Sequence, residues 1–325
     1  MNVPEELRSS IDGATKQAGG VLAGVRERIS LPVTLVAPTV AVLLFLLVIP
    51  VLISIRLSIS GWSPIAGVPW WDAEVIWLNN YIELLTNSEF IYSIGLTIFI
   101  VAVAVTLEFI LGFALALLCT GDFPGQKLFV LIFLTPMMVM PVVVGNTFRI
   151  LFRPGGPIDA IIALFVGHPV SIHWGSTFPA ALFPILLGEV WHWYPLLFLI
   201  LYSGLNSLPE SQLQAAKTLG ASPLQIFRTI SIPNLMPVIL IGIVIRAMGA
   251  IKIFDIVFAI TNGGPGTTTE VISLYLFRQS FEQFNIGFGS AAAWIVFIVS
   301  VLIFTKALSP LLYEEEEYTE EVEGA

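Results

Sequence analysis

Charge is what this sequence has least of. Of its 325 residues only 11% are charged, while 56% are hydrophobic, whereas a soluble domain carries about 25% charged residues. This composition excludes an ordinary soluble fold. The single cysteine, Cys119, excludes an internal disulfide. A G-x-x-x-x-G-K-[ST] phosphate loop is also lacking, so we expect no ATP hydrolysis by that route on this chain.

The hydrophobic residues are gathered into long blocks. The blocks 31–55, 128–148 and 284–305 contain no charged residue, and three others, about 90–120, 179–205 and 233–262, contain only a few. Each is long enough to cross a bilayer, which takes roughly 20 helical residues. Because backbone polar groups in hydrocarbon must be satisfied within their own segment, we predict an all-α, polytopic membrane protein with six transmembrane helices.

Basic residues favour one orientation of these helices. With the N-terminus in the cytoplasm, eight Lys and Arg residues fall on the inner side and four on the outer side, as the positive-inside rule requires. Six spans then return the C-terminus to the cytoplasm. We therefore expect a cytoplasmic N-terminal segment (1–30), a membrane domain (31–313) and an acidic cytoplasmic tail (314–325) that holds seven glutamates.

The predicted outer loops contain few charges. The first, about 60–89, holds four tryptophans and no Lys or Arg, which is typical of anchoring at a membrane interface. The second, about 153–178, contains an apolar stretch at 158–166 that is too short to span. We expect a short helix there.

The loop 206–233 between the fourth and fifth spans is rich in helix start and stop signals. Ser207 followed by Glu210 fits a capping box, and Gly220 predicts the end of that helix. Ser222 then predicts the start of a second short helix. The product is a helix, a tight turn and a helix, with small residues for close approach and apolar anchors at Leu224, Ile226 and Phe227. Such a unit favours insertion into a cleft on a partner.

The same loop resembles the "EAA" loop of binding-protein-dependent ABC importer permeases. That pattern is Glu-Ala-Ala, three residues, Gly, nine residues, Ile, one residue, Leu-Pro. The spacing matches throughout, with Gln214 in place of the usual Glu and Ile232 in place of the usual Leu. The Gln substitution puts a charge contact with the partner in doubt, but not the docking shape.

The resemblance implies a fold, a set of partners and a location. The fold is that of a type I ABC importer permease in a prokaryotic cytoplasmic membrane, and the partners are a second permease subunit, two ATP-binding subunits and an extracytoplasmic solute-binding protein. The chain itself would bind no cofactor, since ATP and Mg²⁺ belong to the ATPase. The residues implied in ATPase coupling are Gln214, Ala215, Ala216, Gly220, Ala221, Phe227, Ile230 and Pro233.

A second pattern follows the fifth span. The run 254–266, with Phe254-Asp255 and Gly263-Gly264-Pro265, resembles the signature of sugar-type ABC permeases, which implies a sugar substrate. Gly263, Gly264 and Pro265 end the fifth helix sharply, and we expect them to form an outer gate or a contact for the binding protein. No metal site is expected.

Five charged residues fall inside predicted spans, where charge is costly and must be paired or face a polar cavity. They are Glu108, Glu189, Arg246, Lys252 and Asp255. Lys252 and Asp255 are three residues apart, so we expect a local ion pair on one helix face. We also expect Asp255 and Asn262 to lie near the translocation path.

Sugars bind aromatic faces and hydrogen-bonding side chains, and the run 191–194 offers both. Trp191 and Tyr194 are our choices for the cavity, although four consecutive residues point in all directions around a helix, so lipid-facing anchoring accounts for some of them. The alternatives are an ABC importer permease for a non-sugar solute, or a secondary transporter, for which the sequence shows no clear inverted repeat.

Overall fold

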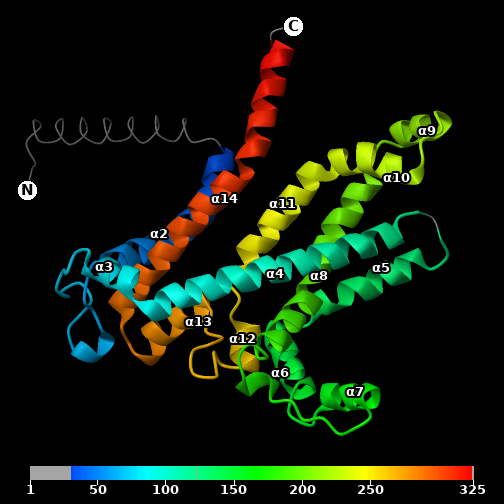
Figure 1. Ribbon diagram of the computed structural model, residues 1–325. Helices are drawn as coiled ribbons and strands as arrows, with labels where there is room; N and C mark the ends of the chain where they lie inside the picture. Colours follow the sequence, from blue (N-terminus) through cyan, green and yellow to red (C-terminus); the bar gives the residue numbers. More distant parts are fainter. Residues whose placement is uncertain (1–30, 122, 324–325) are drawn as a thin grey trace, which may run out of the picture. The chain divides into compact units, whose positions relative to one another are not determined.

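The computed structural model describes residues 31–121 and 123–323 (Figure 1). The predicted N-terminal segment 1–30 lies outside the described residues. In the described part the chain is helical, and β-pairing is confined to an isolated bridge between Ser60 and Val75. The predicted all-α class is confirmed.

The α-helices run in the following order along the chain: α2 Leu31–Ser58, α3 Asn79–Thr86, α4 Ser88–Cys119, α5 Gln126–Leu134, α6 Pro141–Leu151, α7 Pro157–Val166, α8 Leu182–Asn206, α9 Glu210–Thr218, α10 Pro223–Ile226, α11 Ile232–Ala250, α12 Asp255–Ile260, α13 Ile272–Phe277 and α14 Ile286–Glu323. Single turns of 3₁₀ or π-helix connect several of them. The chain divides into two units, residues 1–56 and 57–325. The first contributes most of α2, and everything that follows belongs to the second.

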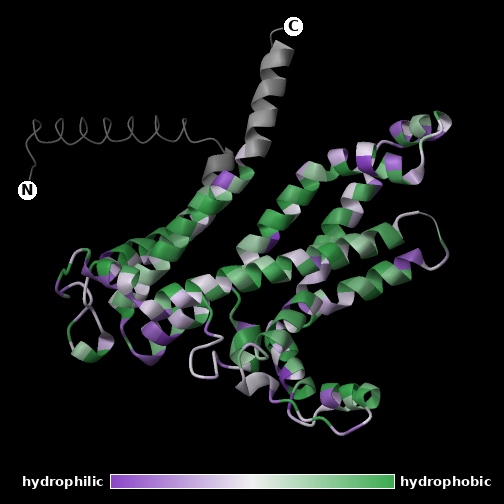
Figure 2. Ribbon diagram, viewed as in Figure 1, coloured by the Kyte–Doolittle hydropathy of each residue, from purple (hydrophilic) through white to green (hydrophobic). Residues whose placement is uncertain are grey.

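Five helices of the described chain are long and apolar enough to cross a membrane. They lie in α2, α4, α8, the stretch from α10 through α11, and α14, and Figure 2 shows the hydrophobic colour along them. A sixth span results if α5 and α6 cross together. That count agrees with the six predicted transmembrane helices.

Two predicted spans are not straight. The expected span 128–148 is bent by 90° between α5 and α6, where a 3₁₀ turn contains Pro136 and a second proline, Pro141, starts α6. The expected helix 233–262 is broken between Ala250 and Asp255. A break in a membrane helix frees backbone groups that need other partners. At this break the Ser273 hydroxyl donates to the carbonyl of Ile253 and so satisfies one of them.

The packing of α4 against α8 organises the second unit. A Cβ added at Gly112 of α4 would lie 2.8 Å from the backbone nitrogen of Phe198 and 3.1 Å from the carbonyl oxygen of Tyr194. Small residues permit this close approach between membrane helices. Around it, Cys119, Phe198 and Leu201 belong to one buried apolar cluster.

The loop 153–178 forms the predicted short helix, α7, and Asp159 holds it in place. One carboxylate oxygen of Asp159 accepts the backbone N–H groups of Gly155 and Ile172, and the other accepts the indole N–H of Trp174, all at 2.8–2.9 Å. Burial opposes the charged form, but these hydrogen bonds outweigh it and lower the pKa of Asp159. The carboxylate therefore stays ionised and fastens both ends of the loop to one point.

The α4–α8 contact yields a test with a built-in control. We expect Gly112→Ala to destabilise the protein by about 1–3 kcal/mol, because the added methyl group meets backbone atoms that cannot move aside. Gly95 lies on the same helix with nothing within 4 Å of an added Cβ, so Gly95→Ala should not lower stability. Thermal unfolding of both variants in detergent measures the difference, and equal melting temperatures would contradict this account of the packing.

Candidate functional site

The loop 206–233 forms the predicted helix–turn–helix, but its first helix starts differently. The expected capping box at Ser207 is wrong: α9 begins at Glu210, its N-cap is Pro209, and no side chain caps it. Ser207 closes α8 instead, and its hydroxyl donates to the carbonyl of Gly204 at 2.8 Å. The last carbonyls of α8 need hydrogen-bond donors, and the N–H and hydroxyl of Ser207 provide them.

The predicted turn at Gly220 is confirmed. Gly220 has φ of 80°, in the left-handed region that favours glycine. Its N–H donates to the carbonyl of Lys217, and the N–H of Ala221 donates to that of Ala216, both at 3.0 Å. These two hydrogen bonds make a Schellman motif, so the end of α9 and the direction of the following chain are fixed by the backbone.

The second short helix starts where predicted. The Ser222 hydroxyl accepts the N–H of Gln225, and the Gln225 side chain accepts the N–H of Ser222, which completes a capping box. Asn234 of α11 donates to the Gln212 side chain of α9 at 3.4 Å. Helix α9 is thus tied to α11.

The apolar residues of this unit divide between the inside and the surface. Ile226 is 7% exposed and packs inward, so it does not offer the anchor expected of it. Phe227 is half-buried, and its ring lies 5.9 Å from that of Phe113 on α4. The exposed apolar side chains are Leu224, as predicted, at 58%, and Leu219 at 87%. Leu219 was missed, because its position before a helix-ending glycine carries no signal of exposure. The coupling roles of the residues named for this loop remain predictions.

Arg246 of α11 forms a buried charge cluster with two glutamates. Its Nε and Nη2 donate to the two carboxylate oxygens of Glu108 on α4, at 2.5 and 2.7 Å, and Nη2 also donates to Glu189 on α8 at 2.6 Å. All three side chains are almost wholly buried. The guanidinium carbon lies 5.1 Å from the ring centre of Trp193, a cation–π distance. The predicted pairing of intramembrane charges holds for these three residues.

The break between α11 and α12 lies beside a small polar cavity of about 80 Å³. Glu189, Trp193, Lys252 and Asp255 contribute to its lining. Lys252 and Asp255 do not form the expected local ion pair among the described residues, because the helix ends before Lys252 and restarts at Asp255. Two acidic side chains, one basic side chain and two aromatic rings therefore line the cavity.

The other residues chosen for the pathway lie elsewhere. Trp191 is 41% exposed and packs against Phe148, with ring centres 6.2 Å apart, and Tyr194 is buried in the apolar cluster between α4 and α8. Asn262 lies in the turn after α12 with φ of 47°. Their roles in the pathway remain predictions. The aromatic residues that line the cavity are Trp193 and Phe254, neither of which was among the residues chosen from the sequence.

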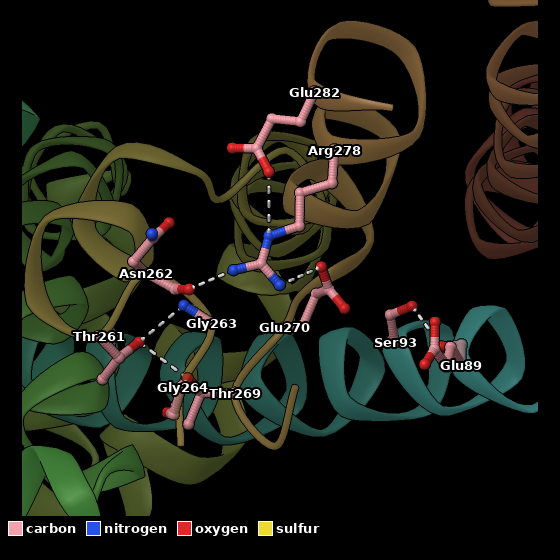
Figure 3. A network of polar contacts seen from close by, with 10 residues as sticks. All are labelled: Glu89, Ser93, Thr261, Asn262, Gly263, Gly264, Thr269, Glu270, Arg278 and Glu282. Carbon is pink, nitrogen blue, oxygen red and sulfur yellow. Dashed lines mark hydrogen bonds and ion pairs between the residues drawn. The ribbon is translucent and has the colours of Figure 1, made fainter. Parts of the chain in front are cut away.

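The turn 261–266 is held by a network of polar contacts (Figure 3). Arg278 donates to the backbone carbonyl of Asn262 at 2.6 Å and to the Glu270 carboxylate at 2.8 Å. A Cβ added at Gly263, where φ is 79°, would lie 3.0 Å from Leu274. Burial raises the pKa of Glu270, and Arg278 opposes that effect. The turn is therefore rigid, as its Gly-Gly-Pro sequence predicts.

Helix α4 holds the segment that follows the turn 261–266. The Tyr92 hydroxyl donates to the carbonyl of Thr268, and the Thr97 hydroxyl accepts the N–H of Ile272, both at 2.8 Å. Since Glu108 also lies on α4, one helix contacts both the outer segment and the charge cluster.

Comparison with known proteins agrees with this geometry. The chain matches the family of binding-protein-dependent transport system inner membrane components over residues 19–312. The chain belongs to this family. It is thus a multi-pass permease component of an ABC-type importer, as the loop 206–233 predicted.

Individual relatives cover most of the chain. It is 36% identical to a probable ABC transporter permease protein, y4oQ, of Sinorhizobium fredii over 87% of this chain and 90% of the relative. It is 30% identical to the trehalose/maltose transport system permease protein MalF of Thermococcus litoralis, over 83% and 90% respectively. Among solved structures, a bacterial ABC transporter that imports the acidic polysaccharide alginate shares the fold, with a TM-score of 0.75 at 19% identity over 88% of this chain and 96% of that one.

The charge cluster predicts a graded pattern of stability. Arg246→Met leaves two buried carboxylates without a cation, and breaking a buried pair in this way costs about 3–5 kcal/mol. The triple variant Arg246→Met/Glu108→Gln/Glu189→Gln removes the charges together and should recover most of that loss. Thermal unfolding in detergent compares the variants. A single variant as stable as the wild type, or a triple variant no better than the single one, would contradict the pairing.

Proposed function

We propose that this chain is the membrane-spanning subunit through which an ABC importer carries a sugar into the cell. The observation that supports coupling most directly is the loop 206–233, whose Schellman turn and capping box present the exposed Leu219 and Leu224. A sugar is favoured over another solute by the relative named for trehalose and maltose transport. The run through Gly263-Gly264-Pro265 supports the same choice.

The proposed assembly contains a second permease subunit, two ATP-binding subunits and an extracytoplasmic solute-binding protein. ATP and Mg²⁺ bind to the ATP-binding subunits, which hydrolyse the nucleotide. Both termini face the cytoplasm, which places the loop 206–233 on the side of the ATPase and the turn 261–266 on the side of the binding protein. The basic residues near the spans support this orientation.

We infer the path of coupling from the two helices that the loop 206–233 connects. The loop 206–233 lies between the end of α8 and the start of α11, and Glu189 on α8 pairs with Arg246 on α11. A push on the loop therefore moves two helices that are joined at the charge cluster. Rigid-body rotation of packed helices is a common way for such a push to open one side of a cavity and close the other.

The coupling prediction concerns Gly220. A tryptophan at this left-handed position costs about 1–2 kcal/mol of backbone strain, enough to lower the population of the docking shape by about tenfold, and its ring adds bulk at the contact. We expect Gly220→Trp to insert in the membrane but to lose sugar uptake while the ATPase still hydrolyses ATP. Uptake and ATP hydrolysis by the reconstituted complex measure the two separately.

Gly121→Trp is the matched control. Gly121 also has a left-handed φ, of 104°, and open space around it, and it lies between α4 and α5, on the same side of the membrane in the proposed orientation. It should keep coupled transport. Full transport by Gly220→Trp would contradict docking through this loop.

The pathway prediction concerns Asp255. Its carboxylate lines the cavity at the helix break and accepts hydrogen bonds from sugar hydroxyls in our proposal, as does the side chain of Asn262 farther along. Asp255→Ala and Asn262→Ala should each reduce ATP-driven uptake of labelled maltose or trehalose. The loss should be about tenfold for the charged hydrogen bond of Asp255 and smaller for the neutral one of Asn262. Asp72→Ala, at an exposed position of the first outer loop, serves as control. Unchanged uptake in both pathway variants would refute their role.

A further inference from the structure

A polar pocket of about 420 Å³ lies apart from the cavity at Asp255. It is formed by the first outer loop and α3 together with the segment that leads from α13 into α14. Seven of its nine lining residues carry side chains that form hydrogen bonds, and five of those seven are Asn or Gln. Its volume is within the range of about 300–1,000 Å³ usual for ligand sites, but its lining is much more polar than that of a site for an apolar ligand.

Most of these polar groups have no partner within the described part of the chain. Gln279 is only 8% exposed, and its side chain makes no hydrogen bond to another described residue. The side chains of Glu83, Gln283 and Asn285 likewise have no such partner. Polar groups of largely buried residues are normally hydrogen-bonded. The Gln279 amide lines the pocket without a partner among the described residues, so it is free to bind a ligand there.

The backbone presents these amides together. The segment 278–282 is a π-helical turn, a feature frequent at functional sites. The chain then reverses at Phe284, a non-glycine residue with φ of 57°, and the N–H of Asn285 donates to the carbonyl of Gln279 at 2.8 Å. This reversal brings Gln279, Gln283 and Asn285 to the same pocket, and left-handed residues of this kind are retained where the surrounding structure requires them.

The residues that line the pocket favour one chemical class of ligand. An anion is disfavoured because the only charged side chain is Glu83 and no Lys or Arg contributes, and no group of metal-ligating residues is present among the described residues. Each amide offers donors and an acceptor, which matches hydroxyl groups that donate and accept at once. Trp62 and Phe288 add flat apolar rings, which suit the C–H face of a sugar ring.

We propose that this outer pocket binds a neutral polyhydroxyl group, as either a free sugar or the sugar headgroup of a glycolipid. The inference goes beyond transport, because the pocket is separate from the cavity at Asp255 and its occupancy does not require import. A free sugar would make it a second sugar site on the outer face. A glycolipid would make it a lipid site at the membrane interface.

The test uses the assembled permease and ATPase subunits in nanodiscs, without the binding protein and with Asp255→Ala throughout to weaken binding at the other cavity. In one arm, saturation-transfer NMR measures the binding of maltose and trehalose. In the other, native mass spectrometry measures retention of a diglucosyl diacylglycerol supplied in the nanodisc. Gln279→Leu should weaken binding by about tenfold, the effect of losing about 1.4 kcal/mol of hydrogen bonding.

Matched variants separate a binding effect from a folding effect. Gln283→Ala and Asn285→Ala change exposed side chains and should weaken binding without lowering the melting temperature. Asp72→Ala, at an exposed position of the loop before α3, should leave binding unchanged. Binding in either arm that the pocket variants reduce supports the proposal, and the arm identifies the source. Binding in neither arm, or binding that these variants leave unchanged, would overturn it. Sugar uptake is not part of the readout, so loss of the import function would not imitate either result.

Discussion

The bidentate pairing of Arg246 with Glu108, and its further bond to Glu189, is the interaction on which the arrangement of the second unit depends. Three charges buried in hydrocarbon are tolerated only if each meets its partner. Because the three residues come from α4, α8 and α11, meeting that condition brings the three helices together at one depth. The close approach at Gly112 reinforces the same contact between α4 and α8.

This cluster also explains the order of the functional parts along the chain. The loop 206–233 joins α8 to α11, the cluster follows farther along α11, and the cavity opens where α11 ends. Glu189 belongs both to the cluster and to the lining of the cavity. Arginine suits this place better than lysine would, since its planar guanidinium binds two carboxylates at once and stacks on Trp193. In our proposal a change in the loop reaches the cavity through these contacts.

Local features could be predicted from the sequence and long-range ones could not. The turn at Gly220 and the cap at Ser222 depend on neighbouring residues, and the apolar blocks depend only on composition; both kinds of prediction are confirmed. Arg246 is 138 residues from Glu108 and 57 from Glu189, so the sequence indicated that these charges need partners but not which ones. The sequence likewise did not indicate the contact of Phe227 with Phe113, or that of Ser273 with Ile253 at the break before Asp255, since each joins residues distant in the sequence.

The predicted capping box at Ser207 failed through a different kind of competition. Ser207 is the C-cap of α8, and its hydroxyl donates to the carbonyl of Gly204 in that helix. Because α9 begins only at Glu210, with Pro209 at its N-cap, Ser207 lies two residues too early to cap it. The helix therefore depends on its Schellman turn and on Asn234 for its position. In our proposal a helix without an N-terminal side-chain cap, held by a backbone motif at its end and by one contact of 3.4 Å at Gln212, adjusts when it meets a partner. The turn 261–266 is held more firmly, because Arg278 donates to the carbonyl of Asn262 and Tyr92 of α4 donates to the carbonyl of Thr268, just after the turn. The stiff side of the protein is thus the one that the binding protein would meet in our proposal, and the adjustable side is the one that the ATPase would move.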